Sequence, residues 1–260
     1  TCAIYANDIF ANYTEYSGPT LMLGAVYFAF QIYGDFSGYS DIAIGTAKLF
    51  GIQLMTNFKT PYFSRDIAEF WRRWHISLST WFRDYLYIPL GGSRVGRWKA
   101  VRNVFVIFLV SGFWHGANWT FIVWGGIHAA LFLPLLLRGK NRRYTSDTIG
   151  EGRWLPTARE FLGMAWTFTM VCVAWVFFRA ESVGEAVDFL GRMTENITTW
   201  PVGNKTKSAL FILALVLSEG FGKNRFALLP SWTRGLLYWL ATLTILLFAS
   251  SSQQFIYFNF

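Results

Sequence analysis

Three histidines, His75, His115 and His128, are the side chains of this sequence best suited to moving a proton near neutral pH. His115 lies in SGFWHGANW (111–119), between the long apolar runs NVFVIFLV and TFIVWGGIHAALFLPLLL. His75 lies in WRRWHISLS, a segment rich in tryptophan and arginine. His128 falls inside the second apolar run, where an interhelical hydrogen bond in a packing role is the simplest use for it.

Two carboxylates, Asp35 and Asp41, interrupt another apolar run, YGDFSGYSDIAIG (33–45). Such carboxylates either line a polar path through an unwound segment or pair with some of the chain's many arginines, and the sequence supports both interpretations equally. The histidines are too scattered to indicate a metal site. Cys2 and Cys172 fall in neither a ligand spacing nor a disulfide framework.

The composition is that of a membrane protein. Hydrophobic residues make up 53% of the chain and charged residues only 15%, which is too little charge to cover the surface of a soluble domain of 260 residues. Several apolar runs approach the ~20 residues needed to cross a bilayer. We therefore expect an all-α polytopic membrane protein that forms one domain over residues 1–260.

The charges predict how the chain is oriented. Basic residues cluster in 59–102, 138–160 and 223–234, whereas 1–20 carries only acidic charge and 179–207 is balanced. An excess of Lys and Arg marks cytoplasmic loops, so the net charge of +8 reflects orientation and indicates no nucleic-acid partner. The crossings that keep every basic block inside are 21–47, 103–137 (outward and back, as two short spans or a re-entrant hairpin), 161–178, 208–222 and 235–250.

This topology places His115 near the middle of the membrane. An ionisable group at that depth is costly unless it faces a cavity or a partner, so His115 indicates a functional site. The competing interpretation is a neutral imidazole that makes interhelical hydrogen bonds.

The basic segment 59–102 contains a helical pattern. Ser64 and Asp66 suit the start of a helix, and Pro89 with the two glycines after it suits the end. Apolar residues recur between them at helical spacing: Ile67, Phe70, Trp71, Trp74, Leu78, Trp81, Phe82 and Tyr85. We expect one helix lying at the membrane interface, with its charges off this stripe. On helix geometry alone, His75 at its edge is more simply incidental than functional.

These motifs together resemble a known family. The runs QIYGDFSGYSDIAIG (31–45), WRRWHISLS (71–79), SGFWHGANWTFIVWGGIHA (111–129) and FIYFNF (255–260) resemble the membrane-bound O-acyltransferase (MBOAT) family, in its alginate O-acetyltransferase branch. The resemblance covers essentially the whole chain. It implies a helical membrane core with re-entrant and interfacial helices, of which this chain is the C-terminal part without the family's early transmembrane helices.

The resemblance also implies roles for the candidate residues. His115, in the WHG motif, matches the family's catalytic histidine, and His75 matches its second signature histidine near the reaction tunnel. Acyl transfer to a hydroxyl needs a base for the hydroxyl proton and donors for the oxyanion. We expect His115 to be the base and His75 to orient a substrate from the cytoplasmic side. Further candidates for substrate contacts are Asn118 and Trp114 beside His115, Arg72 and Arg73 for an anionic donor, and Asp35 and Asp41.

The implied reaction moves an acetyl group from a cytoplasmic donor toward hydroxyls of an extracytoplasmic, alginate-like exopolysaccharide. We expect no tightly bound cofactor, with acetyl-CoA or another acetyl thioester as donor. Expected partners are membrane lipid, the polysaccharide acceptor and periplasmic acetyltransferase proteins, at a bacterial inner membrane. Two alternatives stay open: D-alanyl, peptidoglycan, lipid or protein O-acylation by the same fold, and a non-enzymatic transporter or export-channel subunit whose path is lined by Asp35 and Asp41.

Overall fold

The computed structural model describes residues 2–145, 156–199, 212–213, 215–216, 219 and 229–248. All regular structure in these ranges is helical, as the sequence predicts. The elements are α1 (Cys2–Ala11), η1 (Tyr13–Glu15), α2 (Gly18–Leu49), η2 (Pro61–Phe63), α3 (Ile67–Arg73), α4 (Ile76–Phe82), η3 (Arg83–Tyr87), α5 (Arg97–His115), α6 (Trp119–Leu137), α7 (Ala158–Arg179), α8 (Val183–Arg192) and α10 (Ser231–Phe248). Most of the predicted span 208–222 and all of 255–260 lie outside the described residues.

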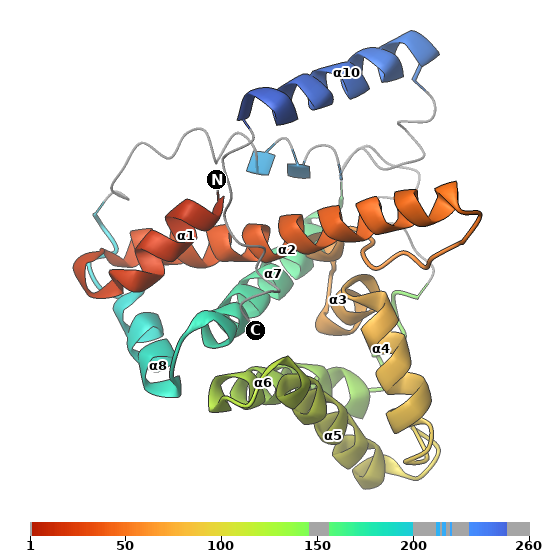
Figure 1. The fold of residues 1–260 in the computed structure, drawn as a ribbon. Coiled ribbons are helices and arrows are strands. Elements are labelled where there is room, and N and C mark those ends of the chain that lie inside the picture. The colour runs from red at the N-terminus through yellow and green to blue at the C-terminus, as the bar shows by residue number, and fades with distance from the viewer. Residues whose placement is uncertain are drawn as a thin grey trace.

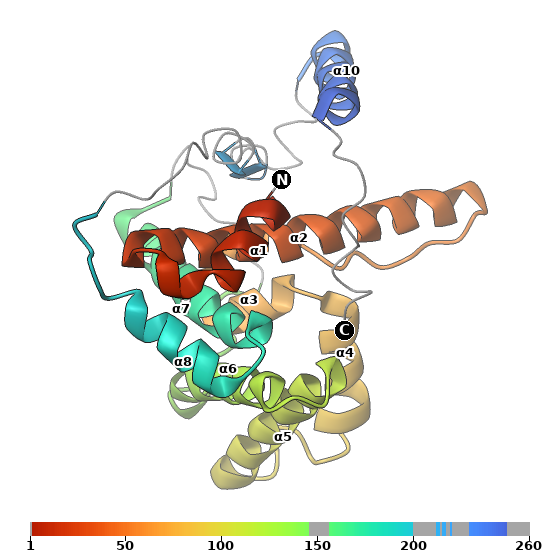
Figure 2. The same ribbon diagram turned by 60° about the vertical axis from the view of Figure 1, so that its left-hand side comes forward.

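Two long helices, α2 and α7, form the frame of the molecule (Figure 1). α2 has 32 residues, which makes it about 48 Å long at 1.5 Å per residue. Its first half packs against α1, and its second half projects beyond the other elements. α7 contacts α2, α6 and α8, so it joins the two sides of the fold. α10 lies apart from the other labelled helices in both views (Figure 2).

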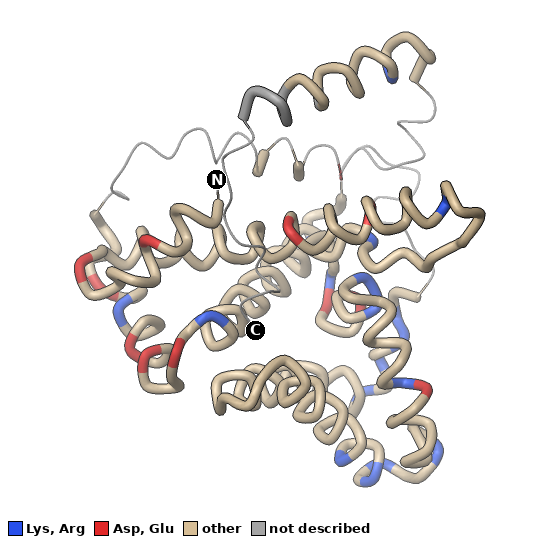
Figure 3. Tube along the Cα trace, viewed as in Figure 1, with Lys and Arg blue, Asp and Glu red and all other residues tan. Residues whose placement is uncertain are grey.

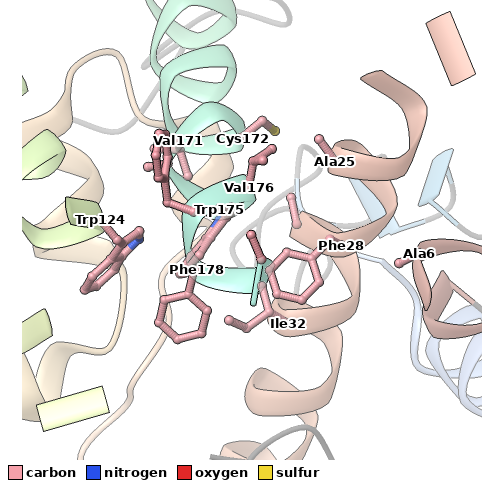
Figure 4. Close-up of a cluster of buried hydrophobic side chains, with 14 of the residues drawn as sticks. Ala6, Ala25, Phe28, Ile32, Trp124, Val171, Cys172, Trp175, Val176 and Phe178 are labelled. Carbon is pink, nitrogen blue, oxygen red and sulfur yellow. The ribbon is translucent and has the colours of Figure 1, made fainter. Parts of the chain in front are cut away.

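The core is aromatic and centres on Trp175 of α7 (Figure 4). Its ring stacks on Trp124 of α6, with centroids 5.8 Å apart, and meets the edge of Phe28 of α2 at 6.4 Å. Phe178, one turn later, packs against both tryptophans. Because each large ring brings a wide contact area, these few side chains hold three helices together.

The α5–α6 hairpin is held by close backbone contact. A Cβ atom on Gly112 would overlap the carbonyl oxygen of Phe121, and one on Gly125 would overlap that of Phe108. Small residues at such positions let two helices approach, which is how apolar helices commonly pack in membranes. The predicted outward and returning run at 103–137 is therefore an antiparallel pair of helices joined at 116–118.

By length and hydropathy, α6 and α7 are the described helices that are long and apolar enough to cross a membrane. Helices also occupy the other described regions in which spans are predicted, namely α2, α5 and α10, but these do not meet the same measure.

Charge is distributed unevenly over the molecule (Figure 3). Lys and Arg gather around α3, α4 and the start of α5, whereas Asp and Glu gather around α1 and α8. The start of α5 and the segment after α6 belong to the basic end, and the turn between α5 and α6 belongs to the opposite end. By the positive-inside rule, the basic end is the one expected to face the cytoplasm.

The predicted single helix after Ser64 is wrong. Asp66, not Ser64, caps α3, since its side chain accepts the Glu69 N–H at 2.8 Å. The helix ends at Arg73, and α4 and a π-helical turn, η3, follow after a break. Helical spacing continues on both sides of this break, so the sequence pattern does not reveal it.

The apolar stripe in the first half of this segment packs against the rest of the protein. α3 lies in the core, where Ile67, Phe70 and the following Trp74 are buried. The outward-facing part is the second half, where Trp81 is 53% exposed and Tyr85 is 69% exposed.

Two adjacent glycines of α6 provide a matched test of the hairpin. Gly125→Ala should lower the stability of the protein by about 1–3 kcal/mol, because the new methyl group overlaps the Phe108 carbonyl. Gly126→Ala should be neutral or slightly stabilising, since the nearest atom to its Cβ is a Leu109 methyl at 3.9 Å. Thermal unfolding of the detergent-solubilised variants measures both. Equal melting temperatures would contradict the close packing of α5 and α6.

Candidate active site

The backbone at His75 separates α3 from α4. Trp74 is extended, and His75 has φ 44° and ψ 54°, which is the left-handed region that residues other than glycine seldom occupy. Asn57 accepts hydrogen bonds from the two residues that follow the break. Its carbonyl accepts the Ile76 N–H at 3.0 Å, and its Oδ1 accepts the Ser77 N–H at 3.1 Å and the Ser77 hydroxyl at 2.6 Å.

The His75 imidazole is enclosed by aromatic rings. It is 8% exposed, and the ring of Phe36 on α2 meets it edge-on at 4.6 Å. Ser77 Oγ lies 3.5 Å from its Nδ1. Burial lowers the pKa of His75 from its ordinary value to about 4, because the charged form is poorly solvated. His75 is therefore neutral near pH 7 and can accept or share a proton.

His115 is the last residue of α5, at the turn of the hairpin. Its ring packs edge-on against Trp124 at 5.3 Å and Phe178 at 5.0 Å, so α5, α6 and α7 meet at this side chain. The sequence predicts that His115 lies near the middle of the membrane, but its side chain is only half-buried in the protein. The fully buried histidine is His128, in the middle of α6. The reason is local: the two apolar runs fold as antiparallel helices, which leaves the residues between them at the turn.

The structure brings the two signature histidines to one place. Trp114 packs against both rings, at 6.3 Å from His75 and 4.9 Å from His115, measured between ring centroids. Residues 40 positions apart in the chain thus form a single cluster that contains two candidate proton-transfer groups.

Three of the predicted substrate-contact residues already have partners within the protein. Asn118 caps α6 by accepting the Thr120 N–H at 3.1 Å, and its Nδ2 donates to the Glu181 carbonyl at 2.8 Å. Arg72 donates to the carbonyls of Asn141 and Tyr144 at 2.8 and 3.2 Å. Arg73 pairs with Glu69 at 2.7 Å. These contacts give all three residues structural roles.

A groove lies at the basic end of the molecule. It has a volume of about 490 Å³ and lies between α4–η3 and the α5–α6 hairpin. Arg83, Arg97 and Arg142 line it together with a largely apolar wall. Ser111, one helical turn before His115, and Leu78, three residues after His75, also belong to its lining. The lining thus includes residues that are close to both histidines in the chain, but neither His75 nor His115 belongs to it.

A second, polar pocket of about 510 Å³ lies at the acidic end, between α1, α7 and α8. Its lining includes Arg179, Glu181 and Glu185. Through the Asn118–Glu181 hydrogen bond, this pocket adjoins the turn that follows His115.

Comparison with known proteins identifies the family. Residues 10–180 match the family model described as MBOAT, membrane-bound O-acyltransferase family. The chain belongs to the membrane-bound O-acyltransferase family. The all-helical membrane class predicted from the sequence is thereby confirmed.

Several curated relatives are similar over much of this chain. A probable alginate O-acetylase, AlgI, of Pseudomonas putida is 46% identical over 193 residues, which is 74% of this chain and 37% of that protein. A peptidoglycan O-acetyltransferase of Helicobacter pylori is 34% identical over an alignment of 289 positions, which covers 99% of this chain and 53% of that protein. A teichoic acid D-alanyltransferase of Bacillus subtilis is 34% identical over an alignment of 164 positions, which covers 59% of this chain and 40% of that protein. The chain thus spans about half or less of the length of these relatives.

The predicted carboxylates of this MBOAT chain both lie on α2. Asp35 is half-buried on α2, and Asp41 is exposed on its projecting half. Neither has a hydrogen bond or ion pair among the described contacts. The α2 residue that does touch a signature histidine is Phe36, adjacent to Asp35.

Sequence reasoning missed several residues that shape the site. Asn57 lies in a loop whose sequence shows neither a helical nor a strand pattern, and its role depends on where that loop packs. Trp124 and Phe178 look like ordinary core residues of apolar helices. Arg97 and Arg142 belong to basic blocks that the sequence explains by orientation alone. Among the described residues, no cluster of three His, Cys, Asp or Glu side chains could hold a metal ion.

The Asn57 contacts predict how the site responds to mutation. Asn57→Ala should lower stability by about 1–3 kcal/mol, because the Ser77 N–H and hydroxyl lose their shared acceptor. Ser77→Ala should lower stability by only about 1 kcal/mol, because the hydrogen bonds from the backbone N–H groups of residues 76 and 77 to Asn57 remain. Thermal unfolding in detergent compares the two. Wild-type stability of Asn57→Ala would show that another interaction holds the break.

Proposed function

We propose that this chain forms the histidine site of a membrane O-acyltransferase that moves an acetyl group from a cytoplasmic thioester toward hydroxyls of an extracytoplasmic polysaccharide. The observation that carries this proposal is the meeting of His75 and His115 around Trp114. The family and the names of its relatives support the same reaction class.

His115 is the base in this proposal. A ring nitrogen takes the proton of the acceptor hydroxyl as its oxygen attacks the thioester carbonyl carbon, which forms a tetrahedral oxyanion. The carbon–sulfur bond then breaks, and the leaving thiolate takes the proton from the imidazolium. The products are the ester and the free thiol. Neutral His75, on the groove side, orients the donor.

The oxyanion needs a hydrogen-bond donor close to His115. Asn118 is already engaged as a helix cap. The indole groups of Trp114 and Trp124 flank His115, and Trp124 Nε1 has no acceptor among the described residues. These N–H groups are the candidates for this role.

The groove suits an acetyl thioester, such as acetyl-CoA. Its arginines provide positive charge for a phosphorylated head, and its apolar wall accommodates the uncharged arm that ends in the thioester. Arg97 and Arg142 take the place that the sequence suggested for Arg72 and Arg73, whose guanidinium groups are used inside the protein.

The acceptor approaches from the opposite end, where the polar pocket adjoins the His115 turn. An alginate-like exopolysaccharide is the favoured acceptor, because the alginate O-acetylase relatives show the higher identities. Peptidoglycan O-acetylation and teichoic acid D-alanylation remain the alternatives within the family. In this proposal the protein is a multi-pass protein of a bacterial inner membrane, and periplasmic acetyltransferases are its partners. Among the described residues, no hydrogen bond or ion pair of Asp35 or Asp41 favours the transporter alternative.

Replacement of His115 tests the proposal. His115→Ala in the full-length protein should reduce acetylation of the secreted polymer by about 10²–10⁴-fold, the usual effect of losing a general base. Acetyl content is measured per amount of protein in the membrane fraction. Asp41→Asn, at an exposed position on α2, is the matched control and should retain activity. Normal acetylation by a well-inserted His115→Ala variant would refute the proposed mechanism, and loss with Asp41→Asn alone would favour transport.

A further inference from the structure

His128 is a polar residue that the proposed mechanism does not use. It is 0% exposed, in the middle of α6, and lies among the rings of Phe70, Trp71, Phe108 and Trp124. A histidine in such a place is expected to have a specific polar partner, because burial of an unpaired polar group is unfavourable.

That partner is Trp71 of α3. The indole Nε1–H of Trp71 donates to His128 Nδ1 at 3.3 Å, with the two rings almost perpendicular at 84°. An indole nitrogen can only donate, so Nδ1 must accept and the proton of the neutral imidazole must lie on Nε2. The bond therefore fixes one tautomer of His128, whose Nε2–H has no acceptor among the described residues.

Each end of this hydrogen bond leads to one of the signature histidines. Trp71 lies four residues before His75, in the last turn of α3 before the break. His128 lies four residues after Trp124 on α6, and the ring of Trp124 contacts His128 at 4.9 Å and His115 at 5.3 Å. Rotation or sliding of α3 against α6 would therefore change the position of His75 relative to His115.

We propose that His128 is a positioning residue whose hydrogen bond to Trp71 sets the placement of His75 relative to His115. The sequence suggests only a packing role for His128. Its hydrogen bond to Trp71 adds a positioning role to that. The kinetic test of this inference rests on the proposed acyl transfer. The hydrogen bond itself can be detected by a method that needs no enzyme assay.

The kinetic test compares side chains with and without an acceptor in the full-length protein. His128→Leu removes the acceptor and should lower kcat by roughly 10- to 100-fold with little change in KM, because displacement of a catalytic group by about 1 Å has effects of this size. His128→Gln can present an amide oxygen to Trp71 and should recover most of kcat. Leu131→Ala, on the same helix and packed against the same core, is the packing control and should keep kcat near that of the wild type.

Trp71→Phe removes the donor from the other side. If the bond is what matters, the Trp71→Phe/His128→Leu double variant should be no slower than His128→Leu alone, since both changes break one interaction. Equal kcat values for the Leu and Gln variants, or additive losses in the double variant, would overturn the proposal.

Nitrogen-15 NMR of histidine-labelled protein in detergent provides the readout that is independent of activity. The signals lost in His128→Gln should show a neutral imidazole protonated at Nε2, and Trp71→Phe should shift them. A neutral imidazole protonated at Nδ1 would overturn the proposed bond even if the enzyme is active. A confirmed bond in a protein that transfers no acyl group would instead refute the proposed function and leave the Trp71–His128 contact in place.

Discussion

The left-handed backbone of His75 is the constraint on which the candidate site depends. A helix continuing from α3 through η3 would carry α4 away from its place along the groove. The left-handed conformation costs a residue other than glycine about 1–2 kcal/mol. Asn57 offsets this by hydrogen bonds to the two residues after the break. The strained residue is thus also a functional candidate, which is where strain tends to collect.

A buried charge network fixes the helix on the other side of this break. Glu69 of α3 is 0% exposed and pairs with Arg65 at 3.0 Å and Arg73 at 2.7 Å, and Arg65 also reaches Glu160 of α7 at 3.1 Å. Removing one partner of such a network leaves a buried charge, so its geometry is strongly specified even where its net contribution to stability is small. The network holds α3 against α7. It also engages the guanidinium of Arg73, which is therefore not free to bind an acyl donor.

The sequence predicts the helices and the identity of the key residues better than their arrangement. Apolar runs suffice to locate α2, α6 and α7, and the motifs around His75 and His115 identify both histidines. The break at His75 could not be predicted, because one left-handed residue leaves the helical spacing on both sides intact. The placement of Asn57, Trp124 and Phe36 at the site depends on contacts between segments far apart in the chain. Polar candidates near the motifs, such as Asn118, prove to stabilise the local fold, which composition cannot reveal.

The central claim is that the groove delivers the acyl end of a thioester to the cluster of His75 and His115. A cryo-EM structure of the full-length protein with a non-reactive thioether analogue of acetyl-CoA tests it most directly. The account predicts the phosphates of the analogue beside Arg97 and Arg142 and its acyl carbonyl beside the His115 imidazole. An analogue bound outside the groove, with its carbonyl remote from both histidines, would contradict it.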